Sequence, residues 1–220
     1  MEVREPEKMK KTYHESRFEF DARRELLWAT LCKSYFQNLI APDACVLEIG
    51  AGYGHFINNI HCKRKIALDS WPGMLGYLAP GIEGIVSSAT DLTQVENGSV
   101  DFAFASNLFE HLTQAELAVT LKQLREKLKP GGTLNILQPN FRFAYKEYFD
   151  DYTHVSIYSD RSLPDFLTVN GFRVLECHPR FLPLTIKSRF PVFPFLIRIY
   201  LRLPLKPLGK QMLIRAARAE

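Results

Sequence analysis

Long apolar runs and internal repeats are absent from this sequence of 220 residues, and a secretory leader is not expected. A membrane-spanning helix needs about eighteen or more consecutive apolar residues, and no such run occurs. The first segment, MEVREPEKMKK, is charged where a secretory signal requires an apolar stretch. We therefore expect a cytoplasmic protein, and a composition of 46% hydrophobic and 24% charged residues predicts that it folds around a core.

Paired cysteine spacings are absent as well. The four cysteines, Cys32, Cys45, Cys62 and Cys177, lack the short repeated spacings of zinc sites and of thioredoxin-like redox sites. Reduced, partly buried thiols are the expected state in a cytoplasmic protein. The sequence therefore predicts no metal site.

Acidic residues are missing from one end of the chain. Residues 178–220 contain nine Lys or Arg residues and a single Glu, whereas residues 1–177 contain 19 basic and 23 acidic residues. The formal net charge of +4 thus arises from a basic C-terminal part attached to a slightly acidic remainder. This asymmetry indicates a surface for anionic groups.

Residues 179–210 carry much of this basic charge together with six prolines and many bulky apolar residues. A helix between Phe195 and Leu203 would place Arg198 and Arg202 on one face and apolar side chains on another, namely Leu196, Ile199 and Leu203. Such a pattern is typical of a peripheral membrane contact, and we expect this insertion to meet anionic lipid. The alternatives are a cover over the sheet edge or a homodimer contact.

Apolar segments of strand length alternate with helical patterns along most of the chain. Strands are predicted at residues 45–49, 65–69, 83–88, 100–106, 133–139, 173–177 and 211–216. Helical stretches are predicted up to about residue 62, after a Thr113–Glu116 capping box until KPGG at 129–132, and before Gly171. This alternation predicts an α/β fold with a parallel sheet that is covered on both faces.

CVLEIGAGYGHF, residues 45–56, combines a strand with three closely spaced glycines. In an open parallel sheet ligands bind where strands end, and glycines there let a ligand approach the main chain. Asp69, 19 residues after Gly50, ends the second predicted strand, where a carboxylate accepts hydrogen bonds from a ribose. The loop therefore predicts a nucleoside-containing ligand, although its G-x-G-x-G rhythm differs from the G-x-G-x-x-G of dinucleotide sites.

Five motifs in series carry a resemblance to a known family: VLEIGAGYGHF, IALDSWPGML, SSATDL, DFAFASNLFEHL and LKPGGTLNILQP. In this order they resemble the motifs of class I S-adenosylmethionine-dependent methyltransferases, and most closely the small-molecule branch called type 11. The similarity runs from about residue 44 to 140. Together with the order of the elements, this similarity predicts a Rossmann-like doubly wound sheet of about seven strands. The sheet is expected to be mostly parallel, with an antiparallel last strand and helices on both faces.

The resemblance implies roles for particular residues. Glu48 and the loop glycines would line the methionine part of S-adenosylmethionine, Asp69 would bind the ribose, Trp71 would face adenine, and Asp91 would accept from its amino group. The full set of expected cofactor-binding residues is Glu48, Gly50, Ala51, Gly52, Gly54, Asp69, Ser70, Trp71, Thr90, Asp91, Ser106 and Asn107. From the residues alone, Asp69 and Asp91 also suit helix caps, and Trp71 also suits a packing role.

Candidates for the chemistry of the acceptor lie in two places. His111, in NLFEHL, follows the fourth predicted strand, so it is expected at the ligand-binding edge as a catalytic or pocket-shaping residue. Residues 140–159 form a long segment rich in aromatic and charged side chains. There we expect Asp151 and His154 to contact the acceptor or act as a base, and Tyr145, Tyr148 and Tyr152 to bind it; a turn or helix cap is the alternative for the aspartate.

The sequence divides into an N-terminal helical lid, residues 1–43, and a cofactor-binding domain, residues 44–220. Residues 13–40 are predicted as helix, with Arg17, Arg23 and Arg24 available to the cofactor carboxylate. Overall the sequence predicts a methyltransferase that converts S-adenosylmethionine to S-adenosylhomocysteine and methylates a hydroxyl or other nucleophile of a small-molecule, sugar or lipid-linked acceptor. Nucleic acid is not expected as a substrate. The alternatives are a nucleotide- or dinucleotide-binding protein and a methyltransferase-like protein without turnover.

Overall fold

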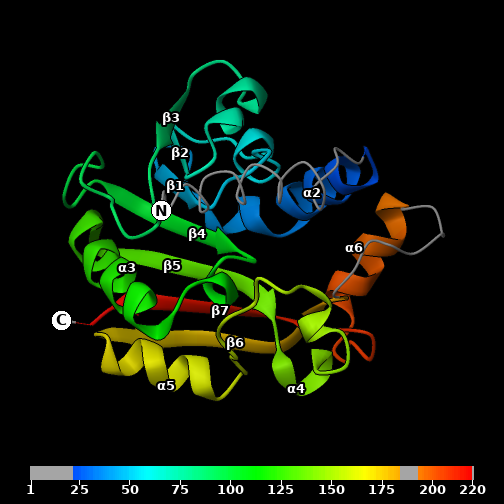
Figure 1. Ribbon diagram of the computed structural model, residues 1–220. Helices are drawn as coiled ribbons and strands as arrows, with labels where there is room; N and C mark the ends of the chain where they lie inside the picture. Colours follow the sequence, from blue (N-terminus) through cyan, green and yellow to red (C-terminus); the bar gives the residue numbers. More distant parts are fainter. Residues whose placement is uncertain (1–21, 184–192, 220) are drawn as a thin grey trace, which may run out of the picture.

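The computed structural model describes residues 22–183 and 193–219 and contains a seven-stranded sheet with the strand order β3-β2-β1-β4-β5-β7-β6 (Figure 1). The strands are β1 Cys45–Ile49, β2 Arg64–Asp69, β3 Ile82–Val86, β4 Val100–Ser106, β5 Leu128–Pro139, β6 Phe172–Leu182 and β7 Gln211–Arg218. β1 to β5 pair in parallel, and β7 runs antiparallel between β5 and β6. The predicted fold class is confirmed.

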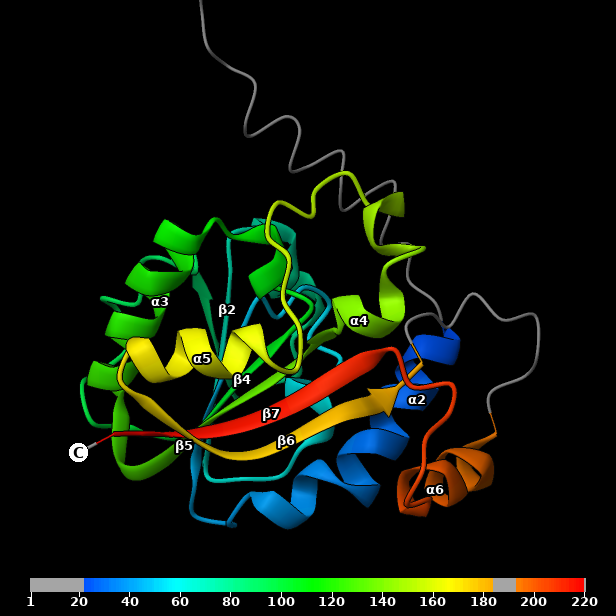
Figure 2. The same ribbon diagram turned by 90° about the horizontal axis from the view of Figure 1, so that it is seen from below.

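Helices cover both faces of this sheet. Figure 2 shows α3 and α5 on one face and α2 and α6 on the other. The α-helices are α2 Ala22–Ser34, α3 Gln114–Lys127, α4 Phe141–Ala144, α5 Ser162–Val169 and α6 Pro194–Arg202. Short 3-10 helices connect them: η1 Phe36–Leu39, η2 Ile57–Asn59, η3 Pro72–Tyr77, η4 Phe109–His111 and η5 Tyr148–Asp150.

Strand β1 shows how the sequence forms two cores. Its five residues are all buried, and alternate side chains enter opposite clusters because successive residues of a strand point to opposite faces. Leu47 and Ile49 belong to the cluster that contains Leu121 of α3, whereas Val46 belongs to the cluster that contains Leu31 of α2. A continuous apolar run is therefore what an inner strand of this sheet requires.

The capping box predicted before the second helix is present. The backbone N–H of Glu116 donates to the Thr113 hydroxyl (3.3 Å), and the Glu116 carboxylate accepts from the Thr113 backbone N–H (2.8 Å). α3 ends at Lys127, two positions before KPGG begins at Lys129, but these four residues lie inside β5 rather than in a loop. Local sequence thus placed both ends of this helix.

Two expectations about helices need correction. The helical stretch expected after the glycines, up to residue 62, is only the 3-10 helix η2 with Ile60 extended after it. The N-terminal helix is described only as α2, which ends at Ser34 and is followed by η1, so the predicted single helix over 13–40 is interrupted. Arg17 lies outside the described residues.

The insertion at residues 179–210 contains the end of β6 and helix α6, while residues 184–192 lie outside the described part. α6 packs against α2 through partly buried side chains that include Ile197, Tyr200 and Leu201. Within residues 22–183 and 193–219, no helix has the length and apolar character needed to cross a membrane.

Candidate active site

The glycine loop turns sharply at the carboxyl end of β1. The backbone N–H groups of Gly50 and Ala51 both donate to the Leu68 carbonyl, at 2.8 and 3.1 Å, which ties the loop to the end of β2. Gly50 has a φ of +71°, and a side chain at this position would begin 3.0 Å from Leu108. The turn after β4 therefore packs directly on the glycine loop.

Gly52 differs from Gly50 because the space beside it is open. Its φ is +52°, and a Cβ atom built there would meet nothing within 4 Å. A bare backbone next to unfilled space at the carboxyl edge of a parallel sheet is the geometry that a cofactor needs to lie against the main chain. The structure therefore leaves room beside Gly52, where the sequence predicts a ligand.

Asp69 connects the first two loops of this edge. One carboxylate oxygen accepts from the backbone N–H of Gly52 and the other from that of Trp71, both at 2.8 Å. The side chain is buried, with 7% of its residue exposed, so its position is fixed by these two amides. The carboxylate also has further lone pairs, so it suits the predicted role of accepting from ribose hydroxyls.

An aromatic cluster lies next to Asp69. Trp71 stacks on Tyr77 with ring centroids 5.8 Å apart, and Tyr53 meets both rings edge-on, at 5.2 Å from Trp71 and 4.6 Å from Tyr77. Trp71 therefore packs against its neighbours and remains partly exposed. Sequence reasoning missed Tyr53 and Tyr77, although Tyr53 stands inside the glycine stretch itself. An adenine ring would find a flat apolar surface here.

Glu48 lies beneath the glycine loop. It is 4% exposed, and its carboxylate accepts from the backbone N–H of Ile57 at 3.0 Å. Burial, and to a smaller extent the nearby Asp69, raises the pKa of this carboxyl well above its usual value. A positive ligand group would stabilise the ionised form, which suits the methionine ammonium of the expected cofactor.

The remaining predicted cofactor residues lie in loops at the same edge. Ser70 is exposed and directly follows Asp69. Asp91 is exposed, and its carboxylate accepts from the N–H and the hydroxyl of Thr93, which lowers its pKa. The sequence left a helix cap open as the alternative for Asp91, whereas the structure shows its carboxylate closing a turn within its own loop. Thr90 bonds Ser88 through its hydroxyl and Gln123 through its carbonyl.

The end of β4 is held in an unusual conformation. Asn107 has a φ of +48°, the one positive value among non-glycine residues of the described chain, and its backbone N–H donates to the Leu137 carbonyl at 2.8 Å. Its side chain donates to Ser106 and accepts from Gln211. Contacts from two neighbouring strands thus fix the turn that presents Leu108 to Gly50.

His111 is oriented by Thr153 and Asp151. Its Nδ1 lies 2.9 Å from the Thr153 hydroxyl and 3.2 Å from the Thr153 carbonyl, while that hydroxyl donates to Asp151 at 2.6 Å. Because both groups near Nδ1 act as acceptors, we assign the ring proton to Nδ1 and the lone pair to Nε2. Burial, with a smaller contribution from His154, lowers the pKa of His111 to about 4, so the ring is neutral at pH 7.

His154 and Glu110 complete a cluster with His111. The two imidazole rings meet edge-on at 4.8 Å, so the three predicted catalytic residues, His111, Asp151 and His154, lie together. Glu110 was not predicted; it is fully buried, and burial raises its pKa to about 8. Its position next to His111 could have marked Glu110 as a site residue, but nothing in the sequence indicates that its side chain is buried.

The three predicted acceptor-binding tyrosines divide into two kinds. Tyr145 and Tyr152 are 57% and 65% exposed, so they are accessible, as a wall of an acceptor site requires. Tyr148 is fully buried, and its hydroxyl donates to the Ser156 carbonyl at 2.5 Å. The expectation of acceptor contact for Tyr148 is corrected, because its ring packs inside the segment, 4.6 Å from the ring of His154.

Comparisons with known proteins place this geometry in a family. A family model described as a methyltransferase domain matches residues 20–177. The malonyl-[acyl-carrier protein] O-methyltransferase of Methylococcus capsulatus is 28% identical over 195 residues, which cover 81% of this chain but only 66% of that protein. Two uncharacterised Mycobacterium tuberculosis proteins are 40% identical over 50 residues, only 16% of their length.

Solved structures share the fold at low sequence identity. A methyltransferase from Archaeoglobus fulgidus, described as dependent on S-adenosylmethionine, has a TM-score of 0.66 and 22% identity, covering 94% of this chain and 98% of that one. A chain of the complex of the Haloferax volcanii Trm112 methyltransferase activator with a protein described as a methyltransferase has a TM-score of 0.68 and 18% identity, covering 91% and 95%.

The site fits the cofactor of this family. The open space beside Gly52 and the carboxylate of Glu48 suit the positively charged amino acid part of the cofactor. The carboxylate of Asp69 suits the ribose, and the aromatic faces next to Trp71 suit the purine. The family model covers well over half of the chain, and the resemblance to class I S-adenosylmethionine-dependent methyltransferases is confirmed. The chain belongs to the methyltransferase domain family and has the class I fold, whose methyl donor is S-adenosylmethionine.

Proposed function

We propose that this chain transfers a methyl group from S-adenosylmethionine to an oxygen atom of a small-molecule, sugar or lipid-linked acceptor. The observation that carries the proposal is the Asp151–Thr153–His111 chain of hydrogen bonds, which orients a neutral imidazole after β4. The backbone N–H of His111 donates to the Leu108 carbonyl at 3.0 Å, and Leu108 packs on Gly50. The imidazole is thereby fixed relative to the glycine loop.

The cofactor would supply an activated methyl group: the acceptor oxygen would bond to the methyl carbon as the carbon–sulfur bond breaks, the electron pair of that bond would stay on sulfur, and the proton of a hydroxyl acceptor would pass to water or to Nε2 of His111. The chain's own residues must hold the two reactants in line and exclude water. Glu48 and Asp69 would hold the amino acid and ribose ends of the cofactor, and Trp71 with Tyr53 its purine. The lone pair on Nε2 of His111 would accept a hydrogen bond, or the proton, from a hydroxyl acceptor.

Two features support an oxygen acceptor with an apolar or bulky portion. The Methylococcus capsulatus relative is an O-methyltransferase of malonyl-[acyl-carrier protein]. In this chain the segment after β5 exposes several large apolar side chains beside the histidine cluster, namely Tyr145, Phe149, Tyr152, Val155 and Ile157. Aromatic side chains around a few polar groups are typical of small-molecule sites.

Incubation with S-adenosylmethionine labelled in its methyl group tests this function. A cell extract is separated into lipid, small-molecule, carrier-protein and nucleic-acid fractions, and we expect label in one of the first three as an alkali-labile ester or a stable ether. His111→Gln should lower the initial rate by about 100-fold or more with little change in cofactor affinity. Label on nitrogen, or in nucleic acid, would contradict the proposed acceptor class.

We further propose that α6 brings the enzyme to anionic phospholipid. The helix exposes Phe195, Leu196 and Ile199, each about half exposed, and is flanked by exposed Phe193, Leu203 and Leu205. We call these six residues the α6 apolar surface. Exposed apolar side chains gathered in one short segment indicate an interaction site.

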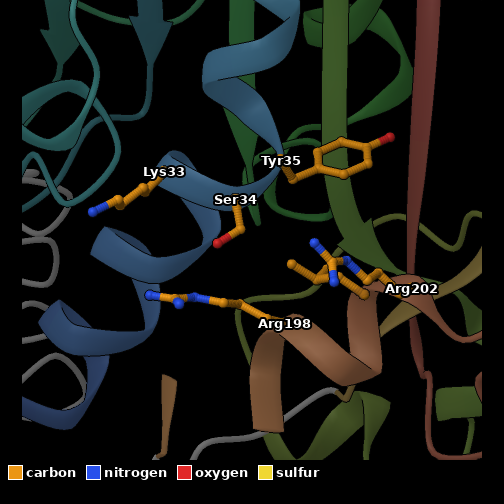
Figure 3. A pocket seen from close by; sticks show the side chains of 6 residues that line it. Lys33, Ser34, Tyr35, Arg198 and Arg202 are labelled. Atoms are coloured by element: carbon orange, nitrogen blue, oxygen red, sulfur yellow. The ribbon is translucent and has the colours of Figure 1, made fainter. Parts of the chain in front are cut away.

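A basic pocket adjoins this surface between α2 and α6 (Figure 3). It has a volume of about 380 Å³ and is lined by Lys33, Ser34, Tyr35, Arg198, Leu201 and Arg202. Three of these side chains are cationic and none is acidic, so the pocket suits an anionic headgroup while the α6 apolar surface enters the acyl region. Part of the basic insertion at residues 179–210 therefore lines a pocket together with the end of α2.

Co-sedimentation with liposomes tests lipid binding. We expect binding to vesicles containing phosphatidylserine and little binding to phosphatidylcholine alone. Leu196→Ser with Ile199→Ser should release the protein, whereas Val169→Ser on α5, a position 86% exposed, is the matched control. Equal recovery in the supernatant with both vesicle types would overturn the proposal. A dimer on gel filtration that these substitutions dissolve would show that a second copy covers the surface.

A further inference from the structure

Glu110, His111 and His154 form a cluster that the fold assembles from two distant segments. Their potential ligand atoms all lie within 4.8 Å of one another. The backbone explains the approach, because the Glu110 carbonyl accepts from the N–H groups of Val155 and Ser156, at 2.9 and 3.1 Å. These bonds place His154 beside η4, which carries the other two side chains.

Glu110 has no evident structural role for its charge. It is fully buried, and neither carboxylate oxygen receives a hydrogen bond from another residue of the described chain. A buried carboxylate normally has hydrogen-bond donors or a cation beside it, since desolvation without them costs several kcal/mol. Glu48 and Asp69, buried at the same edge of the sheet, each receive at least one backbone N–H. The ionised form of Glu110 therefore has no hydrogen-bond donor from another described residue, and a bound cation would stabilise it.

His111 is already held in the manner of a metal ligand. Metal-binding histidines almost always donate their second ring N–H to a carbonyl, carboxylate or water, which fixes both the tautomer and the orientation of the ring. Nδ1 of His111 has the carbonyl and hydroxyl of Thr153 as acceptors, and Asp151 fixes that hydroxyl. Nε2 of His111 is then the nitrogen with the electron pair for coordination.

We propose that Glu110, His111 and His154 bind a divalent transition-metal ion, with zinc as the preferred occupant. Two imidazoles and one carboxylate are the ligands of many catalytic zinc sites, which keep another position open, whereas magnesium and calcium favour oxygen ligands. Bonds of about 2.0–2.2 Å separate tetrahedral ligand atoms by roughly 3.4 Å. Small side-chain rotations would bring the three ligand atoms to that spacing.

The open position would take an oxygen atom of the methyl acceptor, and this assignment rests on the proposed function. A divalent ion there lowers the pKa of a hydroxyl and positions its oxygen, or binds a carboxylate directly. Nε2 of His111 would then act on the acceptor oxygen through the ion that it binds. The cysteines contribute nothing to this site, in agreement with their unpaired spacing.

Metal binding is measured on the whole protein after treatment with a chelator and its removal. Zinc is titrated against a competing chromophoric chelator, and cobalt is added as a spectroscopic probe. We expect one zinc per chain and ligand-field absorption from cobalt in a four- or five-coordinate site. Glu110→Gln and His154→Gln should each weaken zinc binding by about 100-fold or more.

Matched variants separate coordination from general effects. Thr153→Val keeps the carbonyl but removes the hydroxyl near Nδ1, and it should weaken zinc by about 10- to 100-fold, as loss of an outer hydrogen bond does. His61→Gln and Glu96→Gln replace an exposed histidine and an exposed glutamate elsewhere, so they should leave zinc affinity unchanged. Circular dichroism and melting temperature establish that each variant is folded.

The outcomes distinguish this proposal from the proposed function. Zinc affinity in the unmodified protein no tighter than that of Glu110→Gln would overturn the metal site, whatever the activity. Binding of S-adenosylhomocysteine is measured in parallel on the same samples. If zinc does not bind but cofactor binding and methyl transfer are intact, the metal site is refuted and the proposed function stands. If zinc binds but no oxygen acceptor is methylated, the metal site stands and the proposed function is refuted.

Discussion

Buried carboxyl groups have different hydrogen-bond partners on the two sides of the carboxyl edge of the sheet, the glycine-loop side and the side of η4. On the glycine-loop side, Asp69 receives two backbone N–H groups and Glu48 one, from residues at most 17 positions away. On the other side, Glu110 receives none from another described residue and lies among histidines. The side proposed for the cofactor is thus completed by the local backbone, whereas the side proposed for the acceptor contains a buried carboxyl that receives no hydrogen bond from another described residue.

This difference explains why the sequence indicated the glycine loop as a unit but did not indicate Glu110. A loop that supplies its own amides must keep a fixed spacing of glycines and an acid, and such spacing is visible in a single sequence. On the other side, His111 and His154 were predicted separately, each from its own segment, but their contact across 43 positions leaves no local pattern.

Asp69→Asn should weaken binding of S-adenosylhomocysteine by about 100-fold or more. The substitution removes the charge-assisted acceptor for the ribose, and each hydrogen bond to a charged group contributes about 1.5–3 kcal/mol. Isothermal titration calorimetry measures the loss, with Asp165→Asn on exposed α5 as the control. An affinity within threefold of the unmodified protein would show that Asp69 only ties the loops together.

Glu110→Gln should change the dependence of stability on pH in the metal-free protein. Burial raises the pKa of Glu110 from 4.5 to about 8, so the folded state holds a proton that the unfolded state loses in this range. Stability of the unmodified protein should therefore fall as pH rises from about 4.5 to 8, by on the order of 3–5 kcal/mol from this group. His111, His154, Asp151 and Tyr148 lie close to Glu110 and are the same in both proteins, so the comparison isolates the Glu110 carboxyl.

Urea unfolding at pH 5 and pH 8.5, in the presence of a chelator, measures the effect. The Gln variant should gain on the unmodified protein at the higher pH and not at the lower one. Zinc added at pH 8.5 should abolish that gain by stabilising the unmodified protein. A stability difference that is the same at both pH values would contradict the buried, unpartnered state of this carboxyl.

Gly52→Ala should lower cofactor affinity by at least about tenfold through the space that the new methyl group occupies. Gly81→Ala is the matched control, because Gly81 also has a positive φ, of +84°, and open space around its Cβ position, but it lies at the amino end of β3. Both variants should lose about 1–2 kcal/mol of stability from backbone strain. Equal cofactor affinities for the two variants would contradict a ligand beside Gly52.

Thr113→Ala should cost about 1 kcal/mol of stability and leave cofactor and zinc affinity unchanged. The substitution removes the hydroxyl that caps α3, a polar group satisfied within its own turn. Chemical unfolding and calorimetry on the same sample measure the two effects. A change in cofactor affinity above threefold would show that α3 is coupled to the site.

Much of the fold followed from periodicity because inner parallel strands must be apolar and helices must begin and end with particular residues. β1 and β4 have the predicted bounds, and the capping box at Thr113 is present. The long extensions of β5 and β6 were missed, since β6 alternates buried and exposed residues only weakly. The helix expected after the glycine loop is a 3-10 turn, because tertiary packing of Phe56 and Ile57 outweighed local propensity.

Site residues followed the same rule. The glycines and Asp69 were predicted from spacing and lie together at the same edge of the sheet, while Tyr148 was predicted to contact the acceptor and is buried, because a tyrosine in a polar segment gives no sign of whether its ring points inward. Glu110 passed unnoticed for the converse reason: a glutamate next to a histidine after a strand normally lies in solvent. Its burial depends on residues 153–156, which return to η4 from after β5.

Titration of the protein with S-adenosylhomocysteine, S-adenosylmethionine and NAD in one calorimetric series tests the central claim most directly. The account predicts that both sulfur cofactors bind with one site per chain and at least tenfold more tightly than NAD, and that Asp69→Asn removes this preference. Tighter binding of NAD, or no binding of either sulfur cofactor to the folded protein, would contradict the claim that the glycine loop holds a methyl donor.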